Sequence, residues 1–376
     1  MLAALSAKWK RRLFPNIFDG LLSLITIGIA TAVAYSFLKW ALTVADWTVI
    51  GDSMRFLMAG SLPITDVWRA WAAASVFSLM VGLSIGSMSQ AKNLKRVIIG
   101  LVILALIATL MWATNHLSEA LTVGLFIAAG CGWLIIQRLA AKSALLSLGW
   151  ILTTIVMWNI LIPGSGQAAG GLLLGILITL VATVFSFPLG VLLALGRSSR
   201  LPGIRITCVV YIELIRSLPL ISILYWAWMV VPLILPGDLR INDLIRGAVG
   251  FTLFYAAYVA EYVRGGLQGV PEGQVYAARS LGLNTFSATY YIVLPQALRS
   301  VLPGLVGNVL DIFNNVPLLF IIGLTEFVRA GQILLSNPQH SGQLYEVYVF
   351  MFVVYLVIAT LLSWSSRVVE HKLSHT

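Results

Sequence analysis

The stretch PEGQVYAARSLGLNTFSATYYIVLPQA, Pro271–Ala297, lies between two strongly apolar segments, yet it is too polar to cross a bilayer comfortably. Its residues carry the signals of helix ends. Pro271 suits the first position of a helix, where its missing N–H costs nothing, and Glu272 complements the positive end of the helix dipole. Gly282 suits the position just past a helix, where a left-handed backbone is wanted. We therefore expect a helix of about three turns here.

A second helix is expected after this glycine. Asn284 can cap its first turn, and Pro295 marks another break. The stretch is thus a predicted helix–Gly–helix hairpin. In its first helix, Ala277 and Ala278 allow a close approach to another surface, and Arg279 offers a fork of donors for carboxylates or backbone carbonyls. These features predict a docking element.

The hairpin also has a second interpretation. Tyr290 and Tyr291 are residues that favour the membrane–water interface, so an amphipathic helix lying on the bilayer would suit the same pattern. Both interpretations place the stretch outside the hydrocarbon core. The local pattern alone leaves both open.

The composition identifies the class of protein. Of the 376 residues, 59% are hydrophobic and only 10% are charged, whereas a soluble domain carries about 25% charged residues. Cys131 and Cys208 both lie in apolar runs, so no disulfide framework is expected. A basic KWKRR patch precedes an apolar run, 18–38, that is too long for a cleaved signal peptide, so we expect a retained first span.

Ten segments are apolar enough and long enough to cross about 30 Å of hydrocarbon. The expected fold is therefore an all-α, polytopic membrane protein with about ten transmembrane helices. The segments are 18–38, 68–88, 97–114, 119–137, 143–162, 170–195, 207–233, 245–264, 299–322 and 345–366.

The distribution of positive charge predicts the orientation of these spans. With the N-terminus in the cytoplasm, seventeen of the 24 Lys and Arg residues fall in inside segments and six in outside segments, and Arg216 falls in a span. This asymmetry predicts that both termini are cytoplasmic. Because the basic residues follow alternate loops and form no single patch, the sequence also argues against a nucleic-acid partner.

A linker, PGSGQAAGG at Pro163–Gly171, divides the chain into two parts. Residues 1–165 hold about five predicted spans with short loops. Residues 166–376 hold five more, together with one long cytoplasmic loop, 264–299, and charges inside spans. We therefore expect function in the second part, while the first is a scaffold, a partner surface or an evolutionary addition.

Three charged residues lie within predicted spans of the second part. Counted from the span edges, Glu213 lies about 9 Å deep, Arg216 about 14 Å and Asp311 about 18 Å, so the last two bracket the midplane. Buried charges at such depths face a cavity or a partner. An alternative is structural, because Glu213 and Arg216 could pair at i,i+3 along one helix. Pro188, Pro219 and Pro317 can likewise be simple packing kinks.

The hairpin resembles a known loop. Its spacing is similar to the Glu-Ala-Ala, three residues, Gly, nine residues, Ile-x-Leu-Pro signature of bacterial ABC importer permeases, with Tyr276 in the usual Glu position. The resemblance assigns contact with an ATPase to the loop and puts in doubt any salt bridge of that Glu. The implied coupling residues are Tyr276, Ala277, Ala278, Arg279, Gly282, Leu294 and Pro295.

The resemblance extends over residues 170–366. YIELIRSLPLI, Tyr211–Ile221, and EYVRGGLQGVPEGQ, Glu261–Gln274, are similar to segments of the polar-amino-acid uptake subfamily. The long chain looks most like the larger permease subunits of general L-amino-acid systems. This implies a type I importer core of five helices in the bacterial inner membrane. It also implies a sister permease, two ATPase subunits and an extracytoplasmic amino-acid-binding protein.

The resemblance also points to a substrate site. The subfamily usually has Lys-Asp-Thr-Ser-Leu in its fourth core span, where this chain reads Asn314-Asn315-Val316-Pro317-Leu318. Asp311 lies one turn earlier. For an amino-acid zwitterion, Arg216 could hold the carboxylate and Asp311 or Glu213 the ammonium, with Asn314 and Asn315 adding hydrogen bonds. An Arg216–Asp311 pair that only joins two helices remains an alternative.

The sequence carries no catalytic signature of its own. It lacks the Gly-x-x-x-x-Gly-Lys-[Ser/Thr] phosphate loop, a Cys/His metal cluster and a nucleophile elbow. We therefore expect a transport subunit that binds no cofactor, with ATP and Mg²⁺ held by separate ATPase subunits. The alternative is a secondary amino-acid transporter driven by an ion gradient, a class that often carries inverted repeats.

Overall fold

The computed structural model describes residues 17–88, 117–136, 142–162, 169–236 and 241–373. Apart from one β-bridge between Gly171 and Glu326, the regular structure of these ranges is helical, which confirms the expected all-α class. In the first part of the chain the helices are α2 (Ile17–Thr43), α3 (Thr48–Ala59), α4 (Val67–Met88), α6 (Leu117–Ile136) and α7 (Lys142–Leu161).

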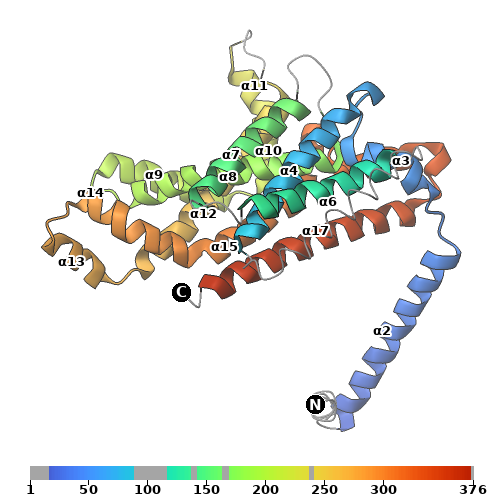
Figure 1. The fold of residues 1–376 in the computed structure, drawn as a ribbon, viewed down its shortest axis with the longest axis horizontal. Helices are drawn as coiled ribbons and strands as arrows, with labels where there is room; N and C mark the ends of the chain where they lie inside the picture. The colour runs from blue at the N-terminus through green and yellow to red at the C-terminus, as the bar shows by residue number, and fades with distance from the viewer. Residues whose placement is uncertain (1–16, 89–116, 137–141, 163–168, 237–240, 374–376) are drawn as a thin grey trace.

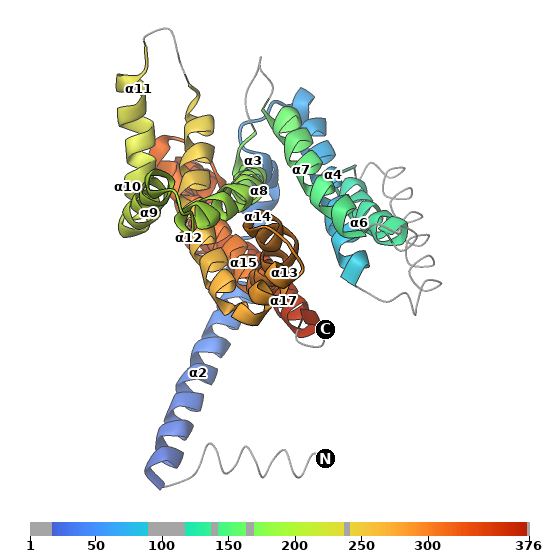
Figure 2. The same cartoon turned by 90° about the vertical axis from the view of Figure 1, so that its left-hand side faces the viewer.

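The second part forms a longer bundle. Its main helices are α8 (Gly171–Arg197), α9 (Pro202–Ser217), α10 (Leu220–Tyr225), α11 (Val231–Ile234), α12 (Asp243–Gly269), α13 (Glu272–Ser280), α14 (Thr285–Ala288), α15 (Leu294–Asn315), α16 (Phe327–Ser336) and α17 (Leu344–Leu373). Figure 1 shows α9, α13 and α14 at one end of this bundle and α3 at the other. In Figure 2, α4, α6 and α7 form a separate group beside it.

By length and composition, the described residues contain five helices suited to cross a membrane, or six if one bent pair counts as a span. The segments Val123–Ile136 and Leu145–Leu161 are shorter apolar helices. Predicted span 97–114 lies outside the described residues. Predicted span 245–264 coincides with α12, which carries charged residues near both ends. The chain is thus a polytopic helical membrane protein, and the count of ten spans stays a prediction.

The prediction of one continuous span over 207–233 is wrong. Helix α9 ends at Ser217, and the helical segment from Leu220 to Ile234 departs from it at 106°. The cause is Pro219, which disfavours the α conformation at the residue before it. Leu218 accordingly has extended backbone angles, with φ −98° and ψ 142°.

The predicted hairpin is confirmed in its first half and corrected in its second. Helix α13 ends before Gly282, whose φ of 82° is left-handed, and Asn284 Oδ1 accepts from Ser287 N at 2.7 Å. Beyond this cap the chain stays helical through α14, the π-helical turn Thr289–Val293 and α15. Pro295 does not end this helical run. It follows closely on the π-helical turn Thr289–Val293, a local change in the hydrogen-bonding pattern of the kind found at helix irregularities.

The helices on either side extend into the predicted loop 264–299, and the part of it that lies outside the membrane stays a prediction. Helix α12 continues to Gly269, and the following candidate span already begins at Thr285 rather than at 299. Pro317 lies within that same candidate span, Thr285–Ile322. It falls in the first turn of the 3-10 segment Val316–Ile322 that follows α15.

Three buried apolar clusters hold the bundle together. The largest joins α4 and α7 to α8, α10, α12 and α15. A second packs Val49, Ile50 and Leu57 of α3 against α16 and α17. The third joins α8, α9, α12 and α15. The first part of the chain is therefore bound to the second over two separate surfaces.

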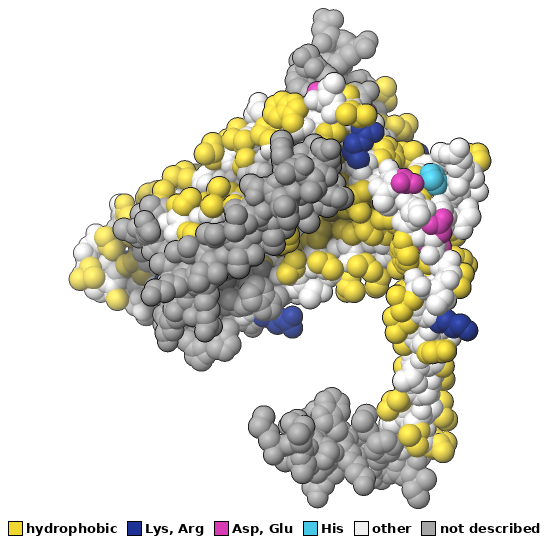
Figure 3. Space-filling model, turned by 45° about the vertical axis from the view of Figure 1, so that its right-hand side comes forward, with side chains coloured by type: hydrophobic (Ala, Val, Ile, Leu, Met, Phe, Trp, Pro, Cys, Tyr) yellow, Lys and Arg dark blue, Asp and Glu magenta, His cyan; other side chains and the backbone are white. Residues whose placement is uncertain are grey.

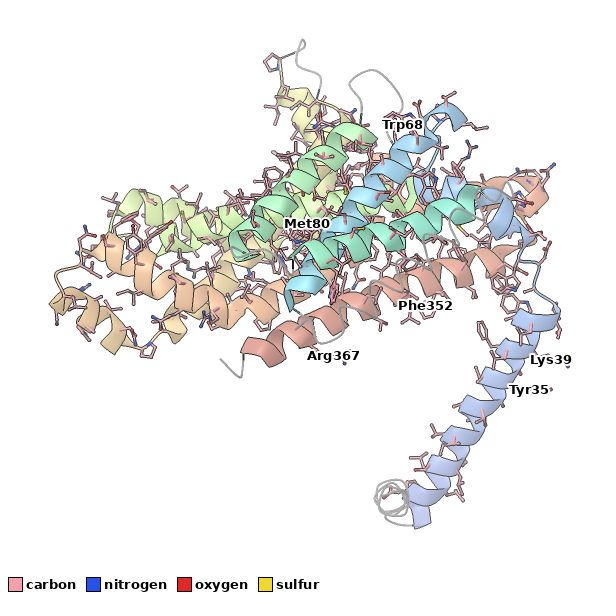
Figure 4. The ribbon with its side chains drawn as sticks, viewed as in Figure 1. Tyr35, Lys39, Trp68, Met80, Phe352 and Arg367 are labelled. Carbon is pink, nitrogen blue, oxygen red and sulfur yellow. The ribbon has the colours of Figure 1, made fainter. Side chains whose placement is uncertain are left out.

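Helix α2 stands apart from this core. The most apolar stretch of this helix is 0% buried, and the helix projects away from the bundle in Figures 1 and 2. Figure 3 shows hydrophobic side chains along its surface, and Figure 4 shows Tyr35 and Lys39 far from Phe352 and Arg367 of α17. Contacts at its C-terminal end include a ring contact between Trp40 and Tyr345.

Candidate functional site

The α13 hairpin presents most of the predicted coupling residues to solvent. Tyr276 is 60% exposed, and Ala277, Arg279, Gly282 and Pro295 are exposed as well. Ala278, in contrast, is buried, and α13 packs on α14 and the π-helical turn that follows it. Leu294 is partly buried. The small residue Ala278 therefore closes the hairpin, while the Tyr276 face stays free for a partner.

Gly282 sets the geometry of this hairpin. Its N–H donates to Arg279 O at 2.9 Å, and Leu283 N donates to Ala278 O at 3.1 Å, which satisfies carbonyls at the end of α13. A Cβ at this position would meet no atom within 4 Å. The requirement for glycine is therefore one of backbone angle and not of space.

Next to the hairpin, five charged side chains form an ion-pair network. Arg197 Nη1, at the end of α8, lies 2.9 Å from Glu213 Oε1 of α9 and 3.5 Å from Glu261 Oε2 of α12. Arg216 Nη1 of α9 lies 3.2 Å from the same Glu261 oxygen. Arg264 pairs with Glu261 along α12. The network thus ties α8, α9 and α12 together just before α12 leads into α13.

Glu213 and Arg216 therefore do not form an ion pair with each other, although their i,i+3 spacing allowed one as an alternative. Each pairs with a residue of another helix, Glu213 with α8 and Arg216 with α12. The guanidinium of Arg216 also lies 5.7 Å from the ring centroid of Tyr258. Among the described residues, no ion pair joins Arg216 to Asp311. The structure thus gives no support to the Arg216–Asp311 strut.

The remaining predicted substrate residues lie together on α15. Asp311 and Asn314 are exposed, and within the described ranges their side chains make no hydrogen bond. Asn315 is different, because its Nδ2 donates to Tyr255 Oη at 3.0 Å and to the backbone carbonyl of Asp311 at 2.8 Å. Tyr255 Oη donates to that same carbonyl at 3.0 Å. Asn315 therefore holds α15 against α12, and Asp311 and Asn314 are left free to meet a ligand.

Sequence reasoning missed Arg197, Glu261 and Arg264. The i,i+3 spacing of Glu261 and Arg264 was a local signal for an ion pair. Nothing local indicates that Arg197, sixty-four positions before Glu261, reaches the same carboxylate.

At the opposite end of the bundle lies a second, tightly packed junction. Glu326 is fully buried and caps α16, accepting from Val328 N at 2.8 Å and from Arg329 N at 2.7 Å. Burial raises the pKa of Glu326 to about 7, although these two backbone donors and the Arg329 charge act in the opposite direction. The carboxyl is thus a buried acid outside the candidate spans.

Glycines allow three chain segments to meet at this junction. Gly170 N donates to Ala59 O at 2.9 Å, and Gly171 N donates to Thr325 O at 2.8 Å. A Cβ on Gly170 would lie 2.6 Å from Thr325 O, so only glycine fits. The end of α3, the start of α8 and the segment before α16 are therefore joined by backbone hydrogen bonds.

Comparison with known proteins shows that the amino-acid sequence matches a protein family. Residues 186–375 match the family model described as binding-protein-dependent transport system inner membrane component. The inner membrane amino-acid ABC transporter permease protein YhdY of Escherichia coli K12 is 35% identical over 265 residues, which cover 68% of this chain and 71% of that protein. The matched region contains the ion-pair network, the α13 hairpin and α15.

Other relatives cover a smaller share of the chain. The glutamate/glutamine/aspartate/asparagine transport system permease protein BztC of Rhodobacter capsulatus is 36% identical over 54% of this chain and 47% of its own length. A crystal structure of an amino acid ABC transporter with histidines shares 27% identity, with a TM-score of 0.49, over 54% of this chain and 92% of that one.

These matches decide between the two functional classes left open by the sequence. A chain of which half matches this family model is a transport subunit and not an enzyme, and the alternative of a secondary transporter is discarded. The chain belongs to the binding-protein-dependent transport system inner membrane components, and it is a multi-pass permease subunit of an amino-acid ABC importer of the bacterial inner membrane.

Proposed function

We propose that this permease couples to an ATPase subunit through the exposed face of α13. The observation that carries the proposal is the left-handed turn at Gly282, which presents Tyr276 and Arg279 while burying Ala278. ATP and Mg²⁺ would be bound by the ATPase subunits, and this chain would hold neither. Tyr276, in place of the usual carboxylate, would bring an aromatic ring with one hydroxyl to the contact, and Arg279 would bring a positive charge.

We further propose that the α13 end faces the cytoplasm, with both termini on that side. Support comes from the excess of Lys and Arg in the segments assigned to this side. On this orientation α3 and α16 lie on the extracytoplasmic side. A cavity of about 440 Å³ opens there between the two helices, lined in part by Asp52, Arg55 and Asn337. These polar side chains suit contact with a binding protein.

For the substrate we propose contact with Asp311 and Asn314, with Asn315 as a positioning residue. The free carboxylate of Asp311 could accept from the ammonium group of an amino acid, and Asn314 could hydrogen-bond to either of its charged ends. Glu213 and Arg216 would instead act in the ion-pair network. In this view the network links movement of α13 to α8 and α9.

The division of the chain at residue 165 also remains a proposal. The family match begins at residue 186, which supports a permease core at 166–376 preceded by extra helices at 1–165. The extra helices would stabilise the core, since α3 packs on α16 and α17. We also propose a sister permease, because one chain with one hairpin offers docking for one ATPase only.

Reconstitution tests the proposed function directly. The chain, purified with its sister permease and ATPase subunits into proteoliposomes, should take up an amino acid when ATP and the binding protein are supplied. Native mass measurement of the same preparation gives the subunit composition. Uptake by the chain alone, driven by an ion gradient, would contradict the proposal.

A further inference from the structure

A cavity of about 670 Å³ lies where the first part of the chain meets the permease core. Its walls come from α7 on one side and from α8 and α12 on the other. Apolar side chains dominate, and no charged side chain is among the lining residues. Representative wall residues are Trp158 of α7, Phe185 and Pro188 of α8, and Val249 and Leu253 of α12.

The few polar side chains in these walls are engaged within their own helices. Thr154 and Thr252 donate their hydroxyl hydrogens to backbone carbonyls four residues earlier, at 2.8 Å and 2.7 Å. Asn159 Nδ2 likewise donates to the carbonyl four residues before it, at 2.8 Å. A zwitterion would lose its hydration there without gaining charged partners. The cavity therefore suits an apolar ligand and not the transported amino acid.

The position of the cavity places it in the hydrocarbon layer. Pro188 lies on α8, a 27-residue candidate span, about 26 Å along the helix from its start and about 14 Å from its end. Water does not fill open apolar space at this depth. If the cavity stayed empty, the side chains in its walls would lose their dispersion contacts. The surrounding bilayer supplies acyl chains at this level.

A single flexible acyl chain is thin enough to enter between α7 and α12. It would contact both parts of the chain at once.

We propose that this cavity is a binding site for one acyl chain of a membrane phospholipid. The bound chain fills the seam between α7 and the core helices α8 and α12. It thereby holds the extra helices against the permease core. A lipid at this seam is part of the folded transporter and not only its solvent.

Filling the cavity with protein tests the proposal. Val249 lines the cavity and is 49% exposed, so Val249→Trp adds bulk into the space without displacing a buried core side chain. The matched control is Leu148→Trp on α7, a residue 63% exposed that does not line the cavity. Native mass spectrometry of the full transporter in mild detergent counts retained phospholipids. We expect Val249→Trp to lose one phospholipid per copy and Leu148→Trp to lose none.

Two further measurements keep the test decisive. Leu253→Trp fills the same space and replaces Val249→Trp if that variant fails to fold. The second measurement uses phosphatidylcholine vesicles with brominated acyl chains. The difference in fluorescence between wild type and Trp158→Phe is the emission of Trp158, which lines the cavity. We expect the brominated chains to quench this emission strongly. Equal phospholipid counts in all variants, an unquenched Trp158 component, or extraction of a free fatty acid alone would each overturn the proposal.

Discussion

Arg216 of α9 and Glu261 of α12 lie 3.2 Å apart, guanidinium to carboxylate, although forty-five positions separate them in the chain. Glu261 also contacts Arg197 and Arg264, so one carboxylate serves three guanidinium groups. Its side chain is 21% exposed. Partial burial limits solvent screening, and removal of this one acid leaves three like charges close together.

We therefore expect Glu261→Gln to destabilise the permease by about 1–3 kcal/mol, a range lowered for the partial exposure of its partners. The matched control is Glu213→Gln, because Glu213 is 56% exposed and, within the described ranges, forms an ion pair only with Arg197. Thermal unfolding of the purified complex should show the larger loss for Glu261→Gln. Equal losses in the two variants would mean that Glu261 is not the centre of the network.

Gly282 provides a test of the coupling hairpin. Gly282→Val places a β-branched side chain at φ 82°, where it is strained although no atom crowds it. We expect ATP hydrolysis to become uncoupled from amino-acid uptake, while Gly282→Asn, which tolerates this region better, keeps more of the coupling. ATPase and uptake rates measured in the same proteoliposomes check this. Full uptake and assembly in Gly282→Val would contradict the role of this glycine.

Leu57 of α3 tests whether the first part of the chain stabilises the core. This side chain is fully buried and packs in a cluster with Phe327, Ala330 and Met351 of the core. Leu57→Ala should cost about 2–5 kcal/mol, whereas Met54→Ala, at a position 37% exposed on the same helix, should cost much less. Chemical unfolding in detergent measures both. No loss in Leu57→Ala would show that α3 does not stabilise the core.

Local signals predict some features of this chain well. The ends of α13 follow from Pro271, Glu272 and Gly282, and the cap at Asn284 is also visible in the sequence, because each acts within a few residues. Helix α3 gives no comparable signal, since its 12 residues are too few for a search based on span length. Only the folded chain shows that it packs against α16.

Tertiary relationships explain what else the sequence could not predict. Pro219 marks a break, but the 106° turn there depends on how the flanking helices pack. The roles of Arg216 and Asn315 also depend on other helices, because their partners Glu261 and Tyr255 lie on α12. A sequence pattern shows where charged residues lie along a span. It does not show which of them pair with a residue of another helix and which have no such partner.

Glu326 predicts a pH dependence of stability. Its pKa rises from 4.5 to about 7 in the folded chain because the carboxyl is buried. The folded state therefore holds the proton more tightly than the unfolded state, and ionisation opposes folding. Stability should fall by at most about 3 kcal/mol as pH rises from 4.5 through 7 and then level off. Thermal unfolding of wild type and Glu326→Gln between pH 5 and 8 should give a flatter profile for the variant, and parallel profiles would refute this.

The free carboxylate of Asp311 carries the final prediction. If Asp311 accepts from the substrate ammonium, Asp311→Asn keeps the size of the side chain but removes its charge, and a lost charge-assisted hydrogen bond of about 1.5–3 kcal/mol corresponds to roughly a 10- to 150-fold weaker interaction. Because this side chain makes no hydrogen bond within the described ranges, assembly and thermal stability should remain near wild type. Asn315→Ala should behave in the opposite way, since its amide joins α15 to Tyr255: stability falls first, and uptake falls with it. Uptake of a panel of amino acids, measured beside thermal unfolding of the same preparations, separates the two effects. Unchanged uptake of every amino acid in Asp311→Asn would remove this residue from the substrate path, and a loss of assembly in that variant would make it a structural residue instead.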